Sequence, residues 1–196
     1  MLYHYTSINA FKSILKDART QMLMCFWATR YDCFADKEEL KLGVETIKRL
    51  LPQVEKSLPS DRQIASSFDW GKIRGNENLP FPYIVSFTSR PDNSYMWKEY
   101  SKSDGIVMEI DDSLNFHTQE SLMMRLCSCI YADENSDEKL VNMLREEYSN
   151  LGYALLKGPN KDVAFYLLKN NPQSFVALIA MGLFSFVAPR IKQAKD

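Results

Sequence analysis

Hydroxyl and aromatic side chains near the middle of the chain could hold a sugar and stack on a flat ring. The hydroxyls are those of Ser86, Thr88 and Ser89, and the rings are those of Tyr95 and Tyr100. Hydroxyls at a strand end beside aromatic rings can bind a ribose and the heterocycle attached to it. In a purely structural role, the same hydroxyls would cap turns and the same rings would fill a core.

Two short apolar runs must position these side chains. Residues 83–88 and 105–110 are rich in β-branched and aromatic residues, a composition typical of buried strands. Between the runs, Pro91 and its polar neighbours predict a turn, and Asp92 or Asn93 predicts the cap of a short helix. We therefore expect the three hydroxyls to lie at a strand end, opposite a helix that bears the tyrosines.

His4 is a further candidate for chemistry, because it lies near the end of a predicted first strand. Residues 2–5 alternate as a short strand does, and Thr6 or Ser7 then caps a predicted helix. A histidine in such a place can bind a ligand, or it can simply bond a backbone carbonyl. We expect its side chain to lie within reach of Ser86, Thr88 or Tyr100.

Three acidic residues, Asp36, Glu38 and Glu39, open a long predicted helix. Carboxylates in such a group could ligate a metal or act as a general base, but first-turn acids commonly pair with the positive end of the helix dipole. No histidine adjoins them in the sequence, so a metal is not indicated. An apolar stripe at helical spacing follows, and we expect Pro52 to end the helix.

The remaining segments before the C-terminal helices are predicted from their composition and turn signals. Residues 22–29 form a nearly continuous apolar run that contains Trp27, which indicates a buried strand, and residues 122–131 indicate another. Residues 52–82 are polar and rich in turn signals. We expect a long surface loop there, with at most one short helix around residues 62–68.

Helices are predicted for the C-terminal part of the chain. Ser136 caps one that Gly158 closes, and Asn171 with Pro172 begins the last. The last helix contains an apolar run, residues 175–188, that is apolar on every side and shorter than a membrane span. We expect it to lie in the core or to contact another chain, either a protein partner or a second copy.

The composition is that of an ordinary globular chain of 196 residues, and we expect one domain, residues 1–196. Lys and Arg number 24 against 25 Asp and Glu, so nucleic acid binding is not indicated. The four cysteines match no common zinc spacing, and the first residues resemble no secretory signal, so we expect a cytoplasmic protein without a membrane role. Irregular strand spacing predicts an α+β fold with a mixed or mainly antiparallel sheet and flanking helices.

Three blocks of the sequence resemble the bacterial family known as domain of unknown function 2971. They are Leu2-Tyr-His-Tyr-Thr-Ser7, Ala35-Asp-Lys-Glu-Glu39, and Val85-Ser-Phe-Thr88 followed by Met96-Trp-Lys-Glu-Tyr100 and Gly105-Ile106. In the second block Asp36 and Glu39 match the usual family pattern, and the resemblance implies an acidic site there. Family members usually continue into an acidic segment where this chain stops, so we expect a shortened member or the loss of that segment.

The layout also resembles that of ADP-ribosyltransferases of the His-Tyr-Glu type, which implies an ADP-ribosyltransferase-like fold and NAD as cofactor. In those enzymes a first-strand histidine bonds the nicotinamide ribose, an aromatic residue stacks on nicotinamide, and a glutamate stabilises the cation-like transition state. By this resemblance His4 is the ribose ligand, Tyr95 or Tyr100 stacks, and the carboxylate is Glu109 or belongs to the absent segment. The implied pocket also includes Tyr5, Thr6, Ser86, Thr88, Ser89 and Trp97.

Two functions remain as alternatives. The first is an NAD-using enzyme, either an ADP-ribosyltransferase-like transferase or an NAD glycohydrolase. The second is a non-catalytic module that binds a nucleotide-like small molecule or a protein. The two alternatives differ in whether a carboxylate faces the pocket of His4.

Overall fold

The computed structural model describes residues 1–21, 26–34, 37–58, 60, 63–71, 81–101, 104–111, 126–133 and 135–193. The chain divides into two compact units. Unit 1 comprises Met1–Thr29 and Tyr83–Leu126, and unit 2 comprises Arg30–Pro82 and Cys127–Asp196. The α+β class is confirmed, whereas one domain over residues 1–196 stays a prediction.

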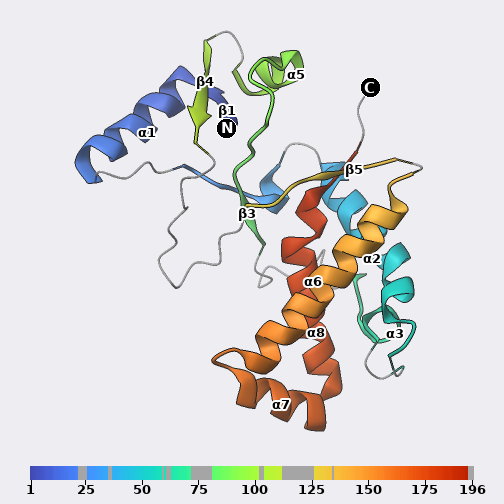
Figure 1. Cartoon of the computed structure of the whole chain (residues 1–196). Helices are drawn as coiled ribbons and strands as arrows, with labels where there is room; N and C mark the ends of the chain where they lie inside the picture. Colours follow the sequence, from blue (N-terminus) through green and yellow to red (C-terminus); the bar gives the residue numbers. More distant parts are fainter. Residues whose placement is uncertain are drawn as a thin grey trace. The chain divides into compact units, whose positions relative to one another are not determined.

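The elements of each unit are drawn in Figure 1. Unit 1 contains β1 (Leu2–Ser7), α1 (Ile8–Gln21), β3 (Tyr83–Ile84), α5 (Ser94–Met96), the π-helical turn η3 (Trp97–Ser101) and β4 (Gly105–Ile110). Unit 2 contains η1 (Tyr31–Cys33), α2 (Lys37–Glu55), α3 (Ile64–Ser67), β5 (Ile130–Ala132), α6 (Asp137–Lys157), α7 (Lys161–Asn170), α8 (Pro172–Phe186), η4 (Ala188–Arg190) and β6 (Ile191–Gln193). The short strand β2 (Thr29–Arg30) lies where the chain first passes from unit 1 to unit 2.

Unit 1 is built on the antiparallel pair of β1 and β4. Their register places His4 opposite Met108 and Tyr3 opposite Glu109, and the backbone of Tyr3 also bridges to Thr88 on its other side. The first strand therefore lies beside the central stretch, as predicted. The cap of α1 is confirmed as well, because the hydroxyl of Ser7 accepts a hydrogen bond from the backbone N–H of Ala10 at 3.2 Å.

The central stretch is less regular than predicted. Only Tyr83–Ile84 form a strand where residues 83–88 were expected to do so, and Thr88 joins the sheet through a single bridge. The short helix after it is confirmed, since the side chain of Asn93 accepts a hydrogen bond from Met96 N–H at 3.2 Å. Tyr5 holds this turn against β1, because its hydroxyl donates to the carbonyl of Pro91 at 2.8 Å.

The core of unit 2 is made by α2, α6 and α8. The predicted stripe of α2 is buried at Val44, Ile47 and Leu51, and α6 buries Leu140 and Leu144. Between the two helices, Arg49 pairs with Asp137 at an exposed position. Hydrogen bonds from Arg49 hold the pKa of the Asp137 carboxyl below its usual value. The strands β5 and β6 pair in parallel in this unit, as one two-stranded sheet.

The helix α2 continues past Pro52, where we expected it to end. It runs to Glu55, and the residue after which it should have stopped, Leu51, is completely buried. A buried contact holds the last turn, because the carboxylate of Glu55 accepts hydrogen bonds from the backbone N–H groups of Ile64 and Ala65 at 2.7 and 3.0 Å. These N–H groups open α3, which lies inside the predicted range of residues 62–68.

The apolar helix α8 packs one part of its surface in the core of unit 2, as predicted. Its N-terminus is capped by the Asn171 side chain, which accepts from Ser174 N–H at 3.2 Å, and Pro172 occupies the first turn. The expectation that it is too short for a membrane needs correction, since Pro172–Arg190 has the length and hydropathy of a span. Within unit 2, 44% of the candidate span is buried. The buried residues of α8 are Phe175, Val176, Ile179, Ala180, Leu183 and Phe184.

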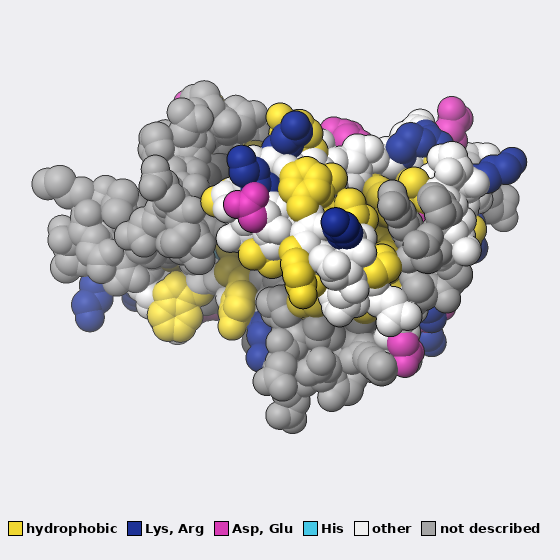
Figure 2. Space-filling view, turned by 90° about the horizontal axis from the view of Figure 1, so that it is seen from below, with side chains coloured by type: hydrophobic (Ala, Val, Ile, Leu, Met, Phe, Trp, Pro, Cys, Tyr) yellow, Lys and Arg dark blue, Asp and Glu magenta, His cyan; other side chains and the backbone are white. Residues whose placement is uncertain are grey.

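The helix α7 carries apolar side chains on its solvent-exposed side. Val163, Phe165 and Tyr166 are each more than half exposed, at 59%, 52% and 65%. Figure 2 shows hydrophobic side chains on the face that contains α7, interspersed with Lys and Arg. Single exposed apolar residues are ordinary in globular proteins, so this surface alone indicates no partner.

Two predicted strands differ from the structure. Residues 26–28 have no regular structure and the following β2 is short, while Trp27 is 82% exposed rather than buried. Of the second predicted strand, residues 126–129 are irregular, and the strand itself is Ile130–Ala132. Residues 22–25 and 122–125 lie outside the described parts of the chain. The apolar runs were real, but an apolar run by itself does not set strand geometry.

Candidate small-molecule pocket in unit 1

His4 is held beside the central stretch by a hydrogen bond and by two aromatic rings. Its Nδ1 lies 3.0 Å from the carbonyl oxygen of Ser86. The rings of Phe26 and Phe87 lie 5.3 and 5.6 Å from the imidazole, centroid to centroid. The predicted proximity of His4 to Ser86 is confirmed, although the contact involves the backbone carbonyl and not the serine hydroxyl.

The hydrogen bond to Ser86 sets the tautomer of the neutral His4 ring. A carbonyl oxygen can only accept, so Nδ1 carries the proton and donates it. The other ring nitrogen, Nε2, is then an acceptor. Among the described residues, no hydrogen-bond partner is assigned to Nε2. His4 can therefore accept a hydrogen bond from a ligand hydroxyl without losing its structural contact.

A cavity of about 310 Å³ lies on the His4 side of β1, between this strand and α1. The strand contributes His4 and Thr6, which share a face because side chains alternate along a strand. The helix contributes two pairs of residues that are four positions apart and so lie on one face. The complete lining consists of His4, Thr6, Asn9, Ala10, Ser13, Ile14 and Trp27.

Within the described part of the chain, the polar groups that line this cavity carry no negative charge. The described residues that line it include an imidazole, two hydroxyls and an amide, but no Asp or Glu. The first turn of α1, which contributes Asn9 and Ala10, also contains no acidic residue. A neutral or anionic ligand therefore meets no carboxylate from the described lining, and Trp27 offers an exposed ring beside it.

Five of the seven lining residues were not predicted to belong to the site: Asn9, Ala10, Ser13, Ile14 and Trp27. Asn9 and Ser13 lie four positions apart on α1, a spacing that the sequence contains but that gained weight only once β1 was placed beside it. Trp27 was assigned to a buried strand because it stands in an apolar run. The sequence signal for Asn9 and Ser13 would have been the polar side of the amphipathic helix α1, whereas no such helical signal includes Trp27.

Tyr5 lies on the opposite face of β1 and is satisfied there. Its hydroxyl accepts a hydrogen bond from Asn93 N–H at 3.0 Å while donating to Pro91. Its ring meets Trp97 edge to face at a centroid distance of 4.9 Å, and the indole N–H of Trp97 donates to Asp92 at 3.1 Å. Tyr5 and Trp97 therefore hold the turn before η3, and neither lines the cavity.

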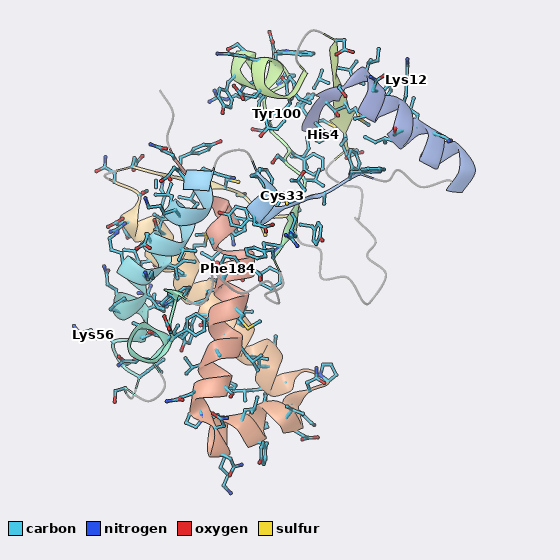
Figure 3. The ribbon with its side chains drawn as sticks, turned by 180° about the vertical axis from the view of Figure 1, so that it is seen from behind. His4, Lys12, Cys33, Lys56, Tyr100 and Phe184 are labelled. Atoms are coloured by element: carbon cyan, nitrogen blue, oxygen red, sulfur yellow. The ribbon has the colours of Figure 1, made fainter. Side chains whose placement is uncertain are left out.

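The predicted hydroxyls and stacking tyrosines do not line the cavity either. The hydroxyl of Thr88 accepts a hydrogen bond from Arg90 N–H at 3.2 Å, so it stabilises the turn. Ser89 is exposed, and Tyr95 and Tyr100 are 47% and 43% exposed on α5 and η3. Figure 3 shows His4 on β1 next to α1, and Tyr100 on the separate helical turn.

Glu109, the predicted catalytic carboxylate, lies on the other face of the strand pair. It is paired with Tyr3, whereas His4 is paired with Met108, and residues paired across an antiparallel sheet share a face. Glu109 is exposed. The structure therefore does not bring the carboxylate of Glu109 together with the imidazole of His4.

The predicted acidic site cannot be placed fully. Asp36 lies outside the described residues, as does the side chain of Glu39, while Glu38 is exposed and pairs with Lys41 at 3.3 Å. Within the described parts of the chain, no group of three His, Cys, Asp or Glu residues is arranged to hold a metal ion. Of the described cysteines, Cys33 and Cys127 are free thiols.

Comparisons with known proteins give no relative. No protein-family model, no curated protein and no solved structure matches this chain.

Proposed function

We propose that unit 1 binds a nucleotide-like small molecule in the cavity between β1 and α1. The observation that carries this proposal is the position of His4, which lines the cavity while its Nδ1–H is committed to Ser86. The remaining ring nitrogen is an acceptor, and a ribose hydroxyl is a donor of the matching kind. The hydroxyl of Ser13 and the amide of Asn9 supply further polar groups along the same cavity.

The side chains around the cavity favour binding over catalysis. Breaking a glycosidic bond requires a negative charge close to the anomeric carbon in the transition state. Glu109, the carboxylate that the resemblance suggests, is on the opposite face of the strands from His4. Hydroxyl, amide and aromatic contacts stabilise the ground state and the transition state equally. They therefore suffice for binding but do not accelerate the reaction.

An NAD-using transferase or glycohydrolase is the second candidate, with NAD as its cofactor. It is favoured by the contact between His4 and Ser86, because the ADP-ribosyltransferase layout requires a first-strand histidine beside the central stretch. Its carboxylate would have to come from a segment other than β4. The two candidates share a binding site and differ in whether nicotinamide is released.

The test is titration calorimetry of the whole chain with ADP-ribose, NAD and adenosine. Ser13→Leu should fill the cavity and weaken binding by at least about tenfold, or 1.4 kcal/mol. The control is Lys12→Leu, which places the same leucine side chain at the preceding position of α1, outside the cavity lining (Figure 3). Its affinity should equal that of the wild type.

Each outcome of this test has a separate meaning. Failure of all three probes to bind at millimolar concentration would refute the proposal. Nicotinamide released from NAD is detected by chromatography. Binding without such release supports the binding module. If nicotinamide is released, and Ser13→Leu abolishes this release while Lys12→Leu preserves it, the NAD-using enzyme replaces the binding module as the proposed function.

A further inference from the structure

Gly152 stands in the middle of α6 without a packing reason for its lack of a side chain. A Cβ added at this position would meet no atom within 4 Å. The helix glycines elsewhere are different: a Cβ at Gly43 would lie 2.4 Å from the carbonyl oxygen of Ala188, and one at Gly182 would lie 2.6 Å from Leu151. Glycine inside a helix is less favourable than alanine, so the open space at Gly152 calls for another explanation.

The space in front of Gly152 is a cavity of about 340 Å³ between α6 and the end of α2. This volume is within the range of small-molecule sites, although the cavity is open to solvent. Arg145, Ser149 and Gly152 form one stripe along α6, because their spacing is close to one helical turn. The other lining residues are Val54, Ser57, Leu58, Tyr148 and Tyr153.

Arg145 supplies a positive charge to this cavity. Its Nη1 donates to the neutral amide oxygen of Asn142 at 2.8 Å, and the ion pairs recorded between described residues do not include it. The hydroxyls of Ser57 and Ser149 also line the cavity. The hydroxyl of Ser149 donates to the carbonyl of Arg145 at 2.8 Å. The guanidinium therefore retains donors that match a planar oxyanion such as a carboxylate.

Two tyrosine rings supply flat apolar surface. Tyr153 is 69% exposed, whereas the hydroxyl of Tyr148 is bonded to the buried carboxylate of Glu55. Glu55 is itself occupied by two backbone N–H groups of α3 and does not line the cavity. The contact with Glu55 therefore fixes the ring of Tyr148 at the edge of the cavity. The ring of Tyr153 is exposed and can stack against the ring of a bound ligand.

We propose that the cavity between α2 and α6 binds a small aromatic carboxylate. The carboxylate would pair with Arg145, the aromatic ring would lie against Tyr148 and Tyr153, and the missing side chain of Gly152 would leave room for the ring. This site is separate from the pocket of unit 1 and does not depend on the function proposed for it.

The experiment titrates the whole chain with indole-3-acetate and with its neutral amide, indole-3-acetamide. The acid should bind more tightly than the amide by about tenfold. Arg145→Gln should remove this preference by weakening the acid alone. Gly152→Leu should weaken both probes by at least about tenfold, and Gly152→Ala should do so by a smaller factor.

Ala154→Leu is the matched control, because it places the same leucine side chain at an exposed position of α6 outside the cavity lining. It should bind both probes as the wild type does. The proposal is refuted if neither probe binds, if acid and amide bind equally, or if Gly152→Leu and Ala154→Leu behave alike. Circular dichroism of each variant separates loss of binding from loss of folding, and Gly152→Ala provides the readout if the leucine variant does not fold.

Discussion

Glu109 lies directly opposite Tyr3 across the β1–β4 pair, on the face of the strands that His4 does not occupy. Side chains alternate between the two faces along a strand, so Tyr3 and its neighbour His4 point to opposite faces. Glu109 shares the face of Tyr3 because the two residues are paired. This relationship separates the two residues that the resemblance to ADP-ribosyltransferases would bring together. It is the main structural reason to expect binding without glycosidic chemistry in unit 1.

We expect Glu109→Gln to leave the affinity for ADP-ribose and NAD unchanged within about twofold, a difference of under 0.5 kcal/mol. His4→Ala in the same calorimetric titration should weaken binding by about 1 to 3 kcal/mol, because a buried ligand hydroxyl would lose its acceptor. Equal losses of affinity in the two variants would show that both side chains contact the ligand. This result would contradict the placement of His4 and Glu109 on opposite faces of the strand pair.

Two glycine substitutions should have opposite effects on stability. Gly43→Ala should destabilise unit 2 by about 1 to 3 kcal/mol, because its Cβ would overlap the backbone of Ala188 at 2.4 Å. Gly152→Ala should stabilise α6 by about 0.5 to 1 kcal/mol, since the added methyl group meets open space. Urea unfolding, monitored by circular dichroism, measures the change in the free energy of unfolding for both variants. Destabilisation by Gly152→Ala would contradict the finding that the space around Gly152 is open.

Arg190 should contribute strongly to the stability of unit 2. Its Nη1 donates to Glu147 at 3.0 Å, its Nε donates to the carbonyl of Ser128 at 3.1 Å, and Glu147 is only 4% exposed. Arg190→Leu would remove the cationic partner of a buried carboxylate, at a cost on the order of 3 kcal/mol. Thermal or urea unfolding measures the loss.

The exposed pair of Arg49 and Asp137 provides the comparison for Arg190. Arg49→Leu should cost much less, because exposed ion pairs are solvated and contribute little. The double variant Glu147→Leu with Arg190→Leu should recover part of the loss, since no buried charge is then left. Equal costs for Arg49→Leu and Arg190→Leu would contradict a special role for the buried pair.

The stability of unit 2 should fall in alkaline solution through Tyr148. Burial raises the pKa of its phenol above the ordinary value of 10.0, and the charge and hydrogen bond of Glu55 raise this pKa further. Below pH 10 both folded and unfolded states keep the proton, so the stabilisation is fully present. As pH rises above that value the unfolded state loses its proton first, and the free energy of unfolding decreases.

Comparison with Tyr148→Phe isolates this effect from other ionisations. The variant lacks the titrating group, so its free energy of unfolding should decrease less between about pH 9 and 11 than that of the wild type. Urea unfolding at several pH values in this window gives the two slopes. Parallel slopes would show that Tyr148 keeps an ordinary pKa.

Local signals in the sequence determined the ends of several elements. The caps at Ser7, Asn93 and Asn171 were predicted because a side-chain oxygen can satisfy backbone N–H groups only a few residues away. The buried stripes of α2 and α6 follow from helical spacing of apolar residues, which is also local. The apolar composition of α8 predicted that it packs in the core, and six of its residues are buried there.

Tertiary contacts decided the features that the sequence left open. Helix α2 continues past Pro52 because Glu55 is held by the N–H groups of α3, a contact between segments that local propensity does not contain. Trp27 stands in an apolar run yet is exposed, because burial depends on what covers a residue and not on its type alone. The register of β1 with β4 set the face of Glu109, and a shift of one residue would have reversed it. The cavity of His4 exists because β1 and α1 bring His4, Asn9 and Ser13 together in space, which no sequence spacing alone specifies.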